Sequence, residues 1–161
     1  MAIILQITGF KKSGKTTLTN CFVQQLKAQD YTVAVIKHDA HAFTIDHPGT
    51  DSHSFRESGA DVVALSSSSQ HAIMVDQGIT LQNMIAQLPP TDVILIEGYK
   101  EAPFPKIVMV RDAEDITTLE SLPAIHTMAT LRDDLPANIL KISTQAAQVA
   151  LCQTIIEEFL Q

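Results

Sequence analysis

The chain has 161 residues, enough for one domain with a buried core, and its 45% of hydrophobic residues excludes an intrinsically disordered chain. The formal net charge of -7 argues against nonspecific binding to nucleic acid or to an anionic membrane. No apolar run approaches the roughly 20 residues of a bilayer-spanning helix, so we expect a soluble cytoplasmic protein. Cys21 and Cys152 lack the spacing of a zinc or redox site, which predicts two buried, reduced thiols.

The first part of the chain predicts a strand, a helix and a second strand. Residues 2–8 form a short apolar run that ends at Gly9, and residues 32–39 form another run that ends in polar side chains. Between them, residues 15–29 carry apolar side chains at helical spacing. This order predicts a right-handed βαβ unit with parallel strands.

The middle of the chain predicts smaller elements. Asp51 or Ser52 is a candidate N-cap of a short helix. Residues 61–67 and 71–76 are two short strands joined by Ser-Ser-Ser-Gln, which indicates a hairpin. Residues 79–88 fit a helix with leucine and isoleucine on one side.

The second half predicts further strands and a long final helix. Residues 92–98, DVILIEG, are a continuous apolar run with a carboxylate near the end, typical of a central parallel strand buried on both faces. Residues 106–111 and 124–129 predict strands, and residues 144–160 predict a helix. Without repeats or a linker, residues 1–161 predict a single α/β domain with helices on both faces of the sheet.

A phosphate-binding motif follows the first strand. Residues 9–16, GFKKSGKT, match the pattern G-x-x-x-x-G-K-[ST] in the required strand–loop–helix context. Gly9 and Gly14 allow the backbone to direct N–H groups at phosphate oxygens, Lys15 reaches the outer phosphates, and Thr16 offers a hydroxyl to Mg²⁺. The fold is therefore predicted as a three-layer α/β/α P-loop nucleotide-binding fold, with a mostly parallel sheet and a β-hairpin insertion.

A carboxylate is placed to complete a magnesium site. Glu97 follows the buried run of residues 92–98, and ligands of parallel α/β sheets lie beyond the carboxyl ends of the strands. A carboxylate there holds Mg²⁺ or its waters in many phosphate-loop proteins. The alternative is a strand-end glutamate that faces solvent.

A polar cluster ends the second strand. Lys37, His38, Asp39 and His41 are expected near the same crevice, with Asp39 as a candidate second-sphere ligand of Mg²⁺. The two histidines stand three residues apart, but a loop gives that spacing no helical face. Hydrogen-bonding scaffolding therefore explains them better than a transition-metal site.

Three further polar residues stand near the predicted short helix. Arg56 near a helix N-terminus is suited to grip a second anion, with Ser52 on the same helical face. A helix cap with a local Asp51–Arg56 pair explains the same residues equally well. Lys100 follows the acidic strand end and faces either the nucleotide or a bound partner.

Four stretches together resemble the molybdopterin-guanine dinucleotide biosynthesis adaptor protein B (MobB) family. They read GFKKSGKTTL, VIKHDAH, HPGTDSHSFRESGA and LIEGYKEAPFPKIVMVRD, in family order, between residues 9 and about 112. The phosphate loop alone is unspecific, whereas its combination with the other three blocks is highly specific. Beyond residue 112 the match is weaker.

The resemblance implies a GTP-binding homodimer that works with Mg²⁺, hydrolyses GTP slowly at most, and assists a separate guanylyltransferase that joins GMP to molybdopterin. By position it assigns phosphate binding to Gly9, Lys11, Lys12, Ser13, Gly14, Lys15, Thr16 and Thr17. Lys11 and Lys12 are also explained as solvated loop residues. The resemblance assigns Mg²⁺ to Thr16 and Glu97, and a polar pocket and crevice to Lys37, His38, Asp51, Ser52 and Arg56.

Guanine specificity and chemistry are less defined. No N-K-x-D signature is present, and Asp133 or Asp134 is a candidate contact to the base. A small-molecule kinase is the alternative, but it requires an arginine-rich lid, and the chain has only Arg56, Arg111 and Arg132. A slow regulatory GTPase is the other alternative, although no glutamine follows the acidic strand to orient water. No residue is assigned a catalytic role.

Overall fold

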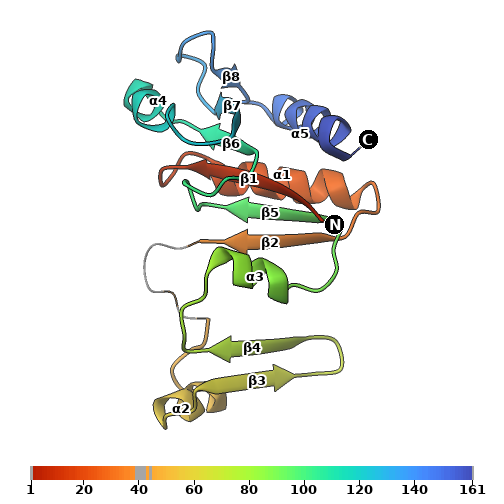
Figure 1. The fold of residues 1–161 in the computed structure, drawn as a ribbon, viewed down its shortest axis with the longest axis vertical. Helices are drawn as coiled ribbons and strands as arrows, with labels where there is room; N and C mark the ends of the chain where they lie inside the picture. Colours follow the sequence, from red (N-terminus) through yellow and green to blue (C-terminus); the bar gives the residue numbers. More distant parts are fainter. Residues whose placement is uncertain (1, 39–42, 44, 161) are drawn as a thin grey trace. The chain divides into compact units, whose positions relative to one another are not determined.

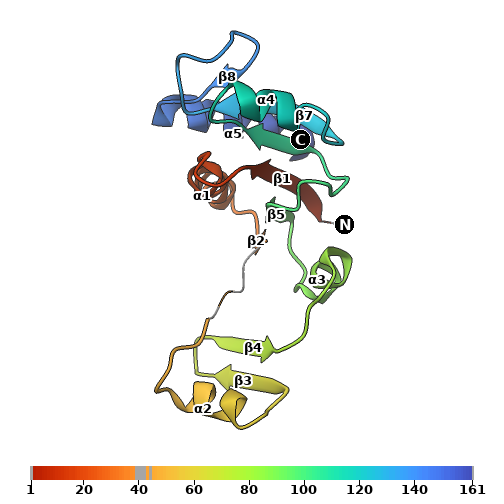
Figure 2. The ribbon, with the colours of Figure 1, turned by 90° about the vertical axis from the view of Figure 1, so that its left-hand side faces the viewer.

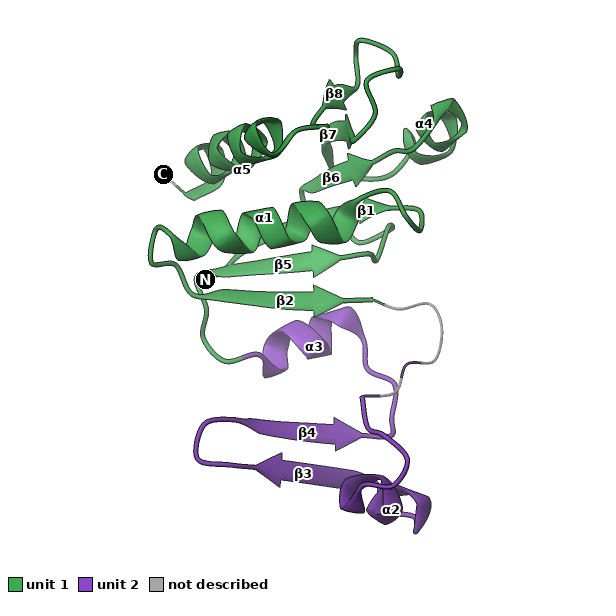
Figure 3. Cartoon of the chain, turned by 180° about the vertical axis from the view of Figure 1, so that it is seen from behind, with its two compact units in different colours: residues 1–38, 89–161 green, residues 39–88 purple. Residues whose placement is uncertain are grey.

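The computed structural model describes residues 2–38, 43 and 45–160 (Figure 1). The chain divides into two compact units, one of residues 1–38 and 89–161 and the other of residues 39–88 (Figure 3). Each unit is described by itself. Within the described ranges, none of the helices combines the length and apolar character needed to cross a membrane.

The first unit is built on a six-stranded sheet in which every pair of neighbours is parallel. Its spatial order is β2-β5-β1-β6-β7-β8. The strands are β1 (Ile3–Gly9), β2 (Val33–Lys37), β5 (Val93–Glu97), β6 (Lys106–Met109), β7 (Ile125–Thr130) and β8 (Leu140–Lys141). Because β1 lies between β5 and β6, the loop that leaves its carboxyl end opens at the centre of the sheet.

Helices cover both faces of this sheet (Figure 2). On one face, α1 (Lys15–Lys27) and α5 (Gln145–Leu160) pack together around a core that includes the fully buried Phe22. On the other, α4 (Ala113–Leu119) packs through Leu119 against β6. Burial on both faces requires apolar side chains at successive positions, and all five residues of β5 are buried. The predicted three-layer α/β arrangement is confirmed.

The second unit contains the predicted hairpin. Its elements are α2 (Asp51–Glu57), β3 (Val62–Ser66), β4 (His71–Val75) and α3 (Leu81–Gln87). Strands β3 and β4 pair antiparallel from Val62 opposite Val75 to Ser66 opposite His71. Since side chains alternate along a strand, Val62, Ile73 and Val75 share one face, and all three are exposed.

The thiols and some element boundaries need comment. Cys21 on α1 and Cys152 on α5 are free, buried members of one core cluster, as predicted, and burial raises the pKa of the Cys152 thiol. Helix α4 and strand β8 were not predicted. The sequence does contain one signal for α4, because aspartate is a preferred N-cap residue. In the structure Asp112 is the N-cap, and its Oδ1 accepts a hydrogen bond from the Asp115 amide.

We expect Phe22→Ala to destabilise the protein by about 3–5 kcal/mol, because the ring is fully buried between α1 and the sheet. The matched control is Gln24→Ala, an exposed change in the same helix that should stay within about 0.5 kcal/mol. Urea unfolding followed by circular dichroism measures both. Similar losses for the two variants would contradict the packing described for this face.

Candidate functional site

The loop between β1 and α1 has the backbone of an anion cradle. Gly9 has φ 141° and Gly14 has φ 91°, and Gly14 is the N-cap residue of α1. No side chain caps the helix at this end, so the N–H groups of its first turn are available to a ligand. The positive end of the helix dipole favours a negative charge at the same place.

Glycine is required in this loop for space as well as for conformation. A Cβ atom at Gly9 would overlap the backbone carbonyl oxygen of Met109 on the neighbouring strand β6. A Cβ atom at Gly14 would overlap the side chain of Leu131. The loop therefore lies directly against the end of the sheet. At position 9 this leaves no room for the side chain of any residue other than glycine.

A hollow of about 380 Å³ lies beside the loop, lined by residues 12–17 and Leu131. This volume falls within the range of small-molecule sites. Six of the predicted phosphate-binding residues line this hollow: Lys12, Ser13, Gly14, Lys15, Thr16 and Thr17. Their binding of a nucleotide remains a prediction.

Two buried hydroxyl groups at the loop have no hydrogen-bond partner among the described residues. They are Oγ1 of Thr8, at the end of β1, and Oγ of Ser13. Buried polar atoms are nearly always paired in a complete structure, so these two mark places where a ligand or water is expected. The sequence singled out Ser13 but not Thr8.

Glu97 meets the first turns of α1. Oγ1 of Thr16 donates a hydrogen bond of 3.1 Å to Oε1 of Glu97, and Oγ1 of Thr19 donates one of 3.5 Å to Oε2. Nζ of Lys37 lies 3.8 Å from Oε1. Glu97 is only 6% exposed, so the alternative of a solvent-facing glutamate is wrong.

A hydroxyl and a carboxylate are the ligands that Mg²⁺ takes beside nucleotide phosphates. The structure brings Thr16 and Glu97 together, while their role as ligands of Mg²⁺ remains a prediction. Thr19 was missed, although it stands three residues after Thr16 and therefore lies on the same helical face. No group of three histidine, cysteine, aspartate or glutamate side chains suited to a metal occurs in the described part of the chain.

Cations gather around the loop. Nζ of Lys15 donates a 2.7 Å hydrogen bond to the carbonyl oxygen of Phe10. Burial lowers the pKa of Lys15; Glu97 opposes this shift, while Lys100, Lys37 and Arg111 add to it. Several positive charges close enough to repel one another make this place attractive to a multiply charged anion.

The ring of Phe10 contacts side chains from the loops that follow β5 and β6. Nζ of Lys100 lies 3.7 Å from the centroid of its ring, and the guanidinium of Arg111 lies 5.3 Å from the same centroid. Arg111 also donates to both carboxylate oxygens of the buried Asp115 and so lowers the pKa of that carboxyl group. This arrangement could not be predicted from the sequence, because it depends on three separate loops.

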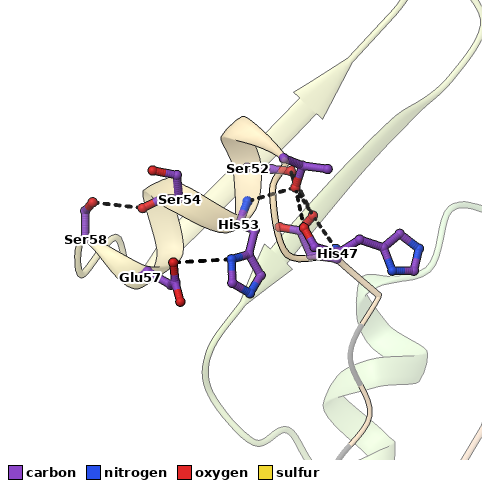
Figure 4. Close-up of polar contacts among 8 residues, drawn as sticks. His47, Ser52, His53, Ser54, Glu57 and Ser58 are labelled. Carbon is purple, nitrogen blue, oxygen red and sulfur yellow. Dashed lines mark hydrogen bonds and ion pairs between the residues drawn. The ribbon is translucent and has the colours of Figure 1, made fainter.

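The predicted polar pocket of the second unit is differently organised. Thr50, not Asp51 or Ser52, caps α2, and its Oγ1 accepts a hydrogen bond from the amide of His53, which is labelled in Figure 4. Hydroxyls of Thr50 and Ser52 both donate to Oδ1 of the buried Asp46. Thr50, Asp51 and Ser52 all carry side chains that can cap a helix, so the sequence alone does not show at which of them α2 begins.

Arg56 is held by a carboxylate, but not by the one considered from the sequence. Its Nε and Nη2 atoms donate to the two oxygens of Asp76, at 3.1 and 2.5 Å. The local Asp51–Arg56 pair is therefore not formed. Arg56 lies in the last turn of α2 and not near its N-terminus, so that part of the prediction is wrong. A second anion at Arg56 remains a prediction, and it requires this ion pair to open or to be shared.

The other predicted crevice residues belong to the first unit or lie outside the described residues. His38 stacks on Tyr99, with ring centroids 4.3 Å apart, directly after β2. Lys37 and Lys100 lie near the phosphate loop, as described above. Asp39 and His41 lie outside the described residues.

The parallel sheet, the central strand and the glycine loop before α1 define an α/β protein of the P-loop fold class. The sequence matches the model of the family MobB, Molybdopterin guanine dinucleotide synthesis protein B, over residues 4–131. The chain belongs to this family. The match extends beyond residue 112, so the resemblance continues further than the four quoted stretches.

Individual relatives agree. The chain is 38% identical over 112 residues to the molybdopterin-guanine dinucleotide biosynthesis adapter protein of Haemophilus influenzae, a match that spans 67% of this chain and 63% of that protein. It is 30% identical over 145 residues to the Escherichia coli protein of the same name, a match that spans 86% of this chain and 82% of that protein. The crystal structure of Bacillus subtilis MobB aligns with a TM-score of 0.76 at 26% identity over 98% of both chains.

We expect Gly9→Ala to destabilise the protein more than Gly59→Ala does. Both glycines have positive φ, which costs alanine roughly 1–2 kcal/mol, but a Cβ at Gly59 meets nothing within 4 Å. The overlap with Met109 should add about 2 kcal/mol at Gly9 alone. Urea unfolding measures the difference, and equal losses would show that the loop does not lie against β6.

Proposed function

We propose that this chain is a GTP-binding adapter that assists the guanylylation of molybdopterin in the synthesis of molybdopterin guanine dinucleotide. The observation that carries the proposal is the glycine loop of a MobB-family chain with Glu97 hydrogen-bonded to Thr16 beside it. The adapter role comes from the names of the relatives. A molybdenum cofactor guanylyltransferase and molybdopterin are the proposed partners, and the cytoplasm is the proposed location.

In this proposal the loop holds the phosphates. The backbone from Gly9 to Thr17 and the side chain of Lys15 surround them, and Lys11 and Lys12 add positive charge. Lys15 now donates to the Phe10 carbonyl oxygen and would exchange it for a phosphate oxygen. Thr16 and Glu97 would hold Mg²⁺, whose charge would offset that of the phosphates.

The preference for guanine rests on the family. Both candidate base contacts have partners in the structure: Asp134 pairs with Arg132, and Asp133 accepts a hydrogen bond from Ser143. A base contact from either residue would have to replace or share that partner. GTP rather than ATP is therefore a proposal without an assigned guanine contact.

A small-molecule kinase is a weaker alternative. The chain has three arginines, and each donates to a carboxylate: Arg56 to Asp76, Arg111 to Asp115 and Arg132 to Asp134. A kinase lid needs arginine charge that is free to neutralise the transferred phosphoryl group. Slow GTP hydrolysis is the most enzymatic activity that we propose, and no residue is given a catalytic role.

We further propose that the chain works as a single domain and as a homodimer, as expected for the family. The exposed face of the β3–β4 hairpin supports the dimer. Val62, Ile73 and Val75 on this face are 54%, 65% and 51% exposed. A two-stranded sheet is marginally stable alone, and two copies of a self-complementary apolar face form the two-fold contact that most dimers use.

Nucleotide titration tests the site directly. We expect Lys15→Ala to abolish GTP binding, because it removes the charge at the centre of the cradle, and Glu97→Ala to lose mainly the part of the affinity that depends on Mg²⁺. Isothermal titration calorimetry with and without Mg²⁺ measures the affinity for GTP and its dependence on Mg²⁺. Lys27→Ala, at the far end of α1, is the control. Unchanged Mg²⁺ dependence in Glu97→Ala would remove Glu97 from the metal site.

A charge on the hairpin face should separate the dimer. We expect Ile73→Asp to be monomeric at micromolar concentration, since it places a carboxylate on the face proposed to be buried. Ser68→Asp adds the same charge at the exposed hairpin turn and should leave the dimer intact. Size-exclusion chromatography with light scattering measures the mass. A dimeric Ile73→Asp variant would place the contact elsewhere.

A further inference from the structure

The turn that follows β5 is held in place by hydrogen bonds from a buried glutamine on β1. Nε2 of Gln6, on β1, donates to the carbonyl oxygens of Gly98 and Tyr99 at 2.5 and 2.6 Å. Gln6 is only 1% exposed. Gly98 and Tyr99 have φ values of 100° and 47°, so the turn holds a non-glycine residue in the left-handed region. Such a conformation persists only where its surroundings hold it.

A buried lysine holds the other side of the same turn. Nζ of Lys106, on β6, donates to the carbonyl oxygens of Lys100 and Ala102 at 2.7 and 2.6 Å, and Lys106 is 1% exposed. Burial lowers the pKa of Lys106, because removing the ammonium group from water disfavours its charged form. Two buried polar side chains from two strands therefore fix the backbone that carries Lys100.

The side chain of Lys100 stands against the phosphate loop without an ion pair. Its ammonium group lies over the ring of Phe10, the residue whose carbonyl oxygen accepts the hydrogen bond of Lys15. Two other cations of this region are paired with carboxylates, since Lys37 pairs with Glu97 and Arg111 pairs with Asp115. Among the described residues, no carboxylate lies within ion-pair distance of Lys100.

We propose that Lys100 binds the outermost phosphate of the nucleotide and makes the site prefer a nucleoside triphosphate to a diphosphate. The inference rests on the proposed nucleotide site. Lys100 follows Glu97 by three residues, so it stands beside a residue that would hold Mg²⁺ against the phosphates. An ammonium ion on an aromatic face is held more weakly than one paired with a phosphate, so the outermost phosphate draws Lys100 from Phe10.

The test compares a diphosphate with a triphosphate. Isothermal titration with GDP and with a non-hydrolysable GTP analogue, both with Mg²⁺, is carried out on the wild type and on Lys100→Gln. We expect the variant to lose about tenfold in affinity for the analogue, the loss of one charge-assisted contact, and to bind GDP within about twofold of the wild type. Retained GDP binding also shows that the variant is folded.

Two further variants separate charge from position. Lys100→Arg keeps the charge and should bind the analogue within about threefold of the wild type. Lys27→Gln removes one charge at the far end of α1 and should change neither affinity. Equal losses for both nucleotides in Lys100→Gln, or no loss for either, would overturn the inference and leave the nucleotide site standing. A wild type that binds neither nucleotide would overturn the proposed function as well.

Discussion

The hydrogen bond between Thr16 and the buried Glu97 is the contact on which the candidate site depends. It forms because β1 and β5 pair in a register that sets Ile7 beside Glu97, which brings the carboxyl end of β5 close to the first turn of α1. A buried carboxylate needs charged or hydrogen-bonding neighbours, and Thr16, Thr19 and Lys37 provide them. The same geometry would place a metal ion against the phosphate loop.

The surrounding charges are divided between two tasks. Both arginines of this unit, Arg111 and Arg132, are tied to carboxylates, whereas Lys15 and Lys100 are held by a carbonyl oxygen and an aromatic ring. Those weaker contacts can be exchanged for phosphate oxygens at little cost. The arrangement suits a protein that holds a nucleotide better than one that transfers its phosphoryl group.

Much of the fold could be predicted from the sequence, because apolar runs mark parallel strands and the glycine motif marks the start of α1. Glu97 near Thr16 followed from the rule that parallel strands end at one edge of a sheet. The partners of Arg56 and Arg111, and the position of Phe10, could not be predicted, because they depend on loops that are distant in the sequence. The cap of α2 was misassigned because three adjacent residues carry capping side chains.

We propose that the chain binds its partner directly and that bound GTP strengthens this contact. The most direct measurement is retention of a purified molybdenum cofactor guanylyltransferase on the immobilised chain, with and without GTP and Mg²⁺. We expect the guanylyltransferase to be retained, and more strongly when GTP and Mg²⁺ are present. No retention under either condition would contradict it.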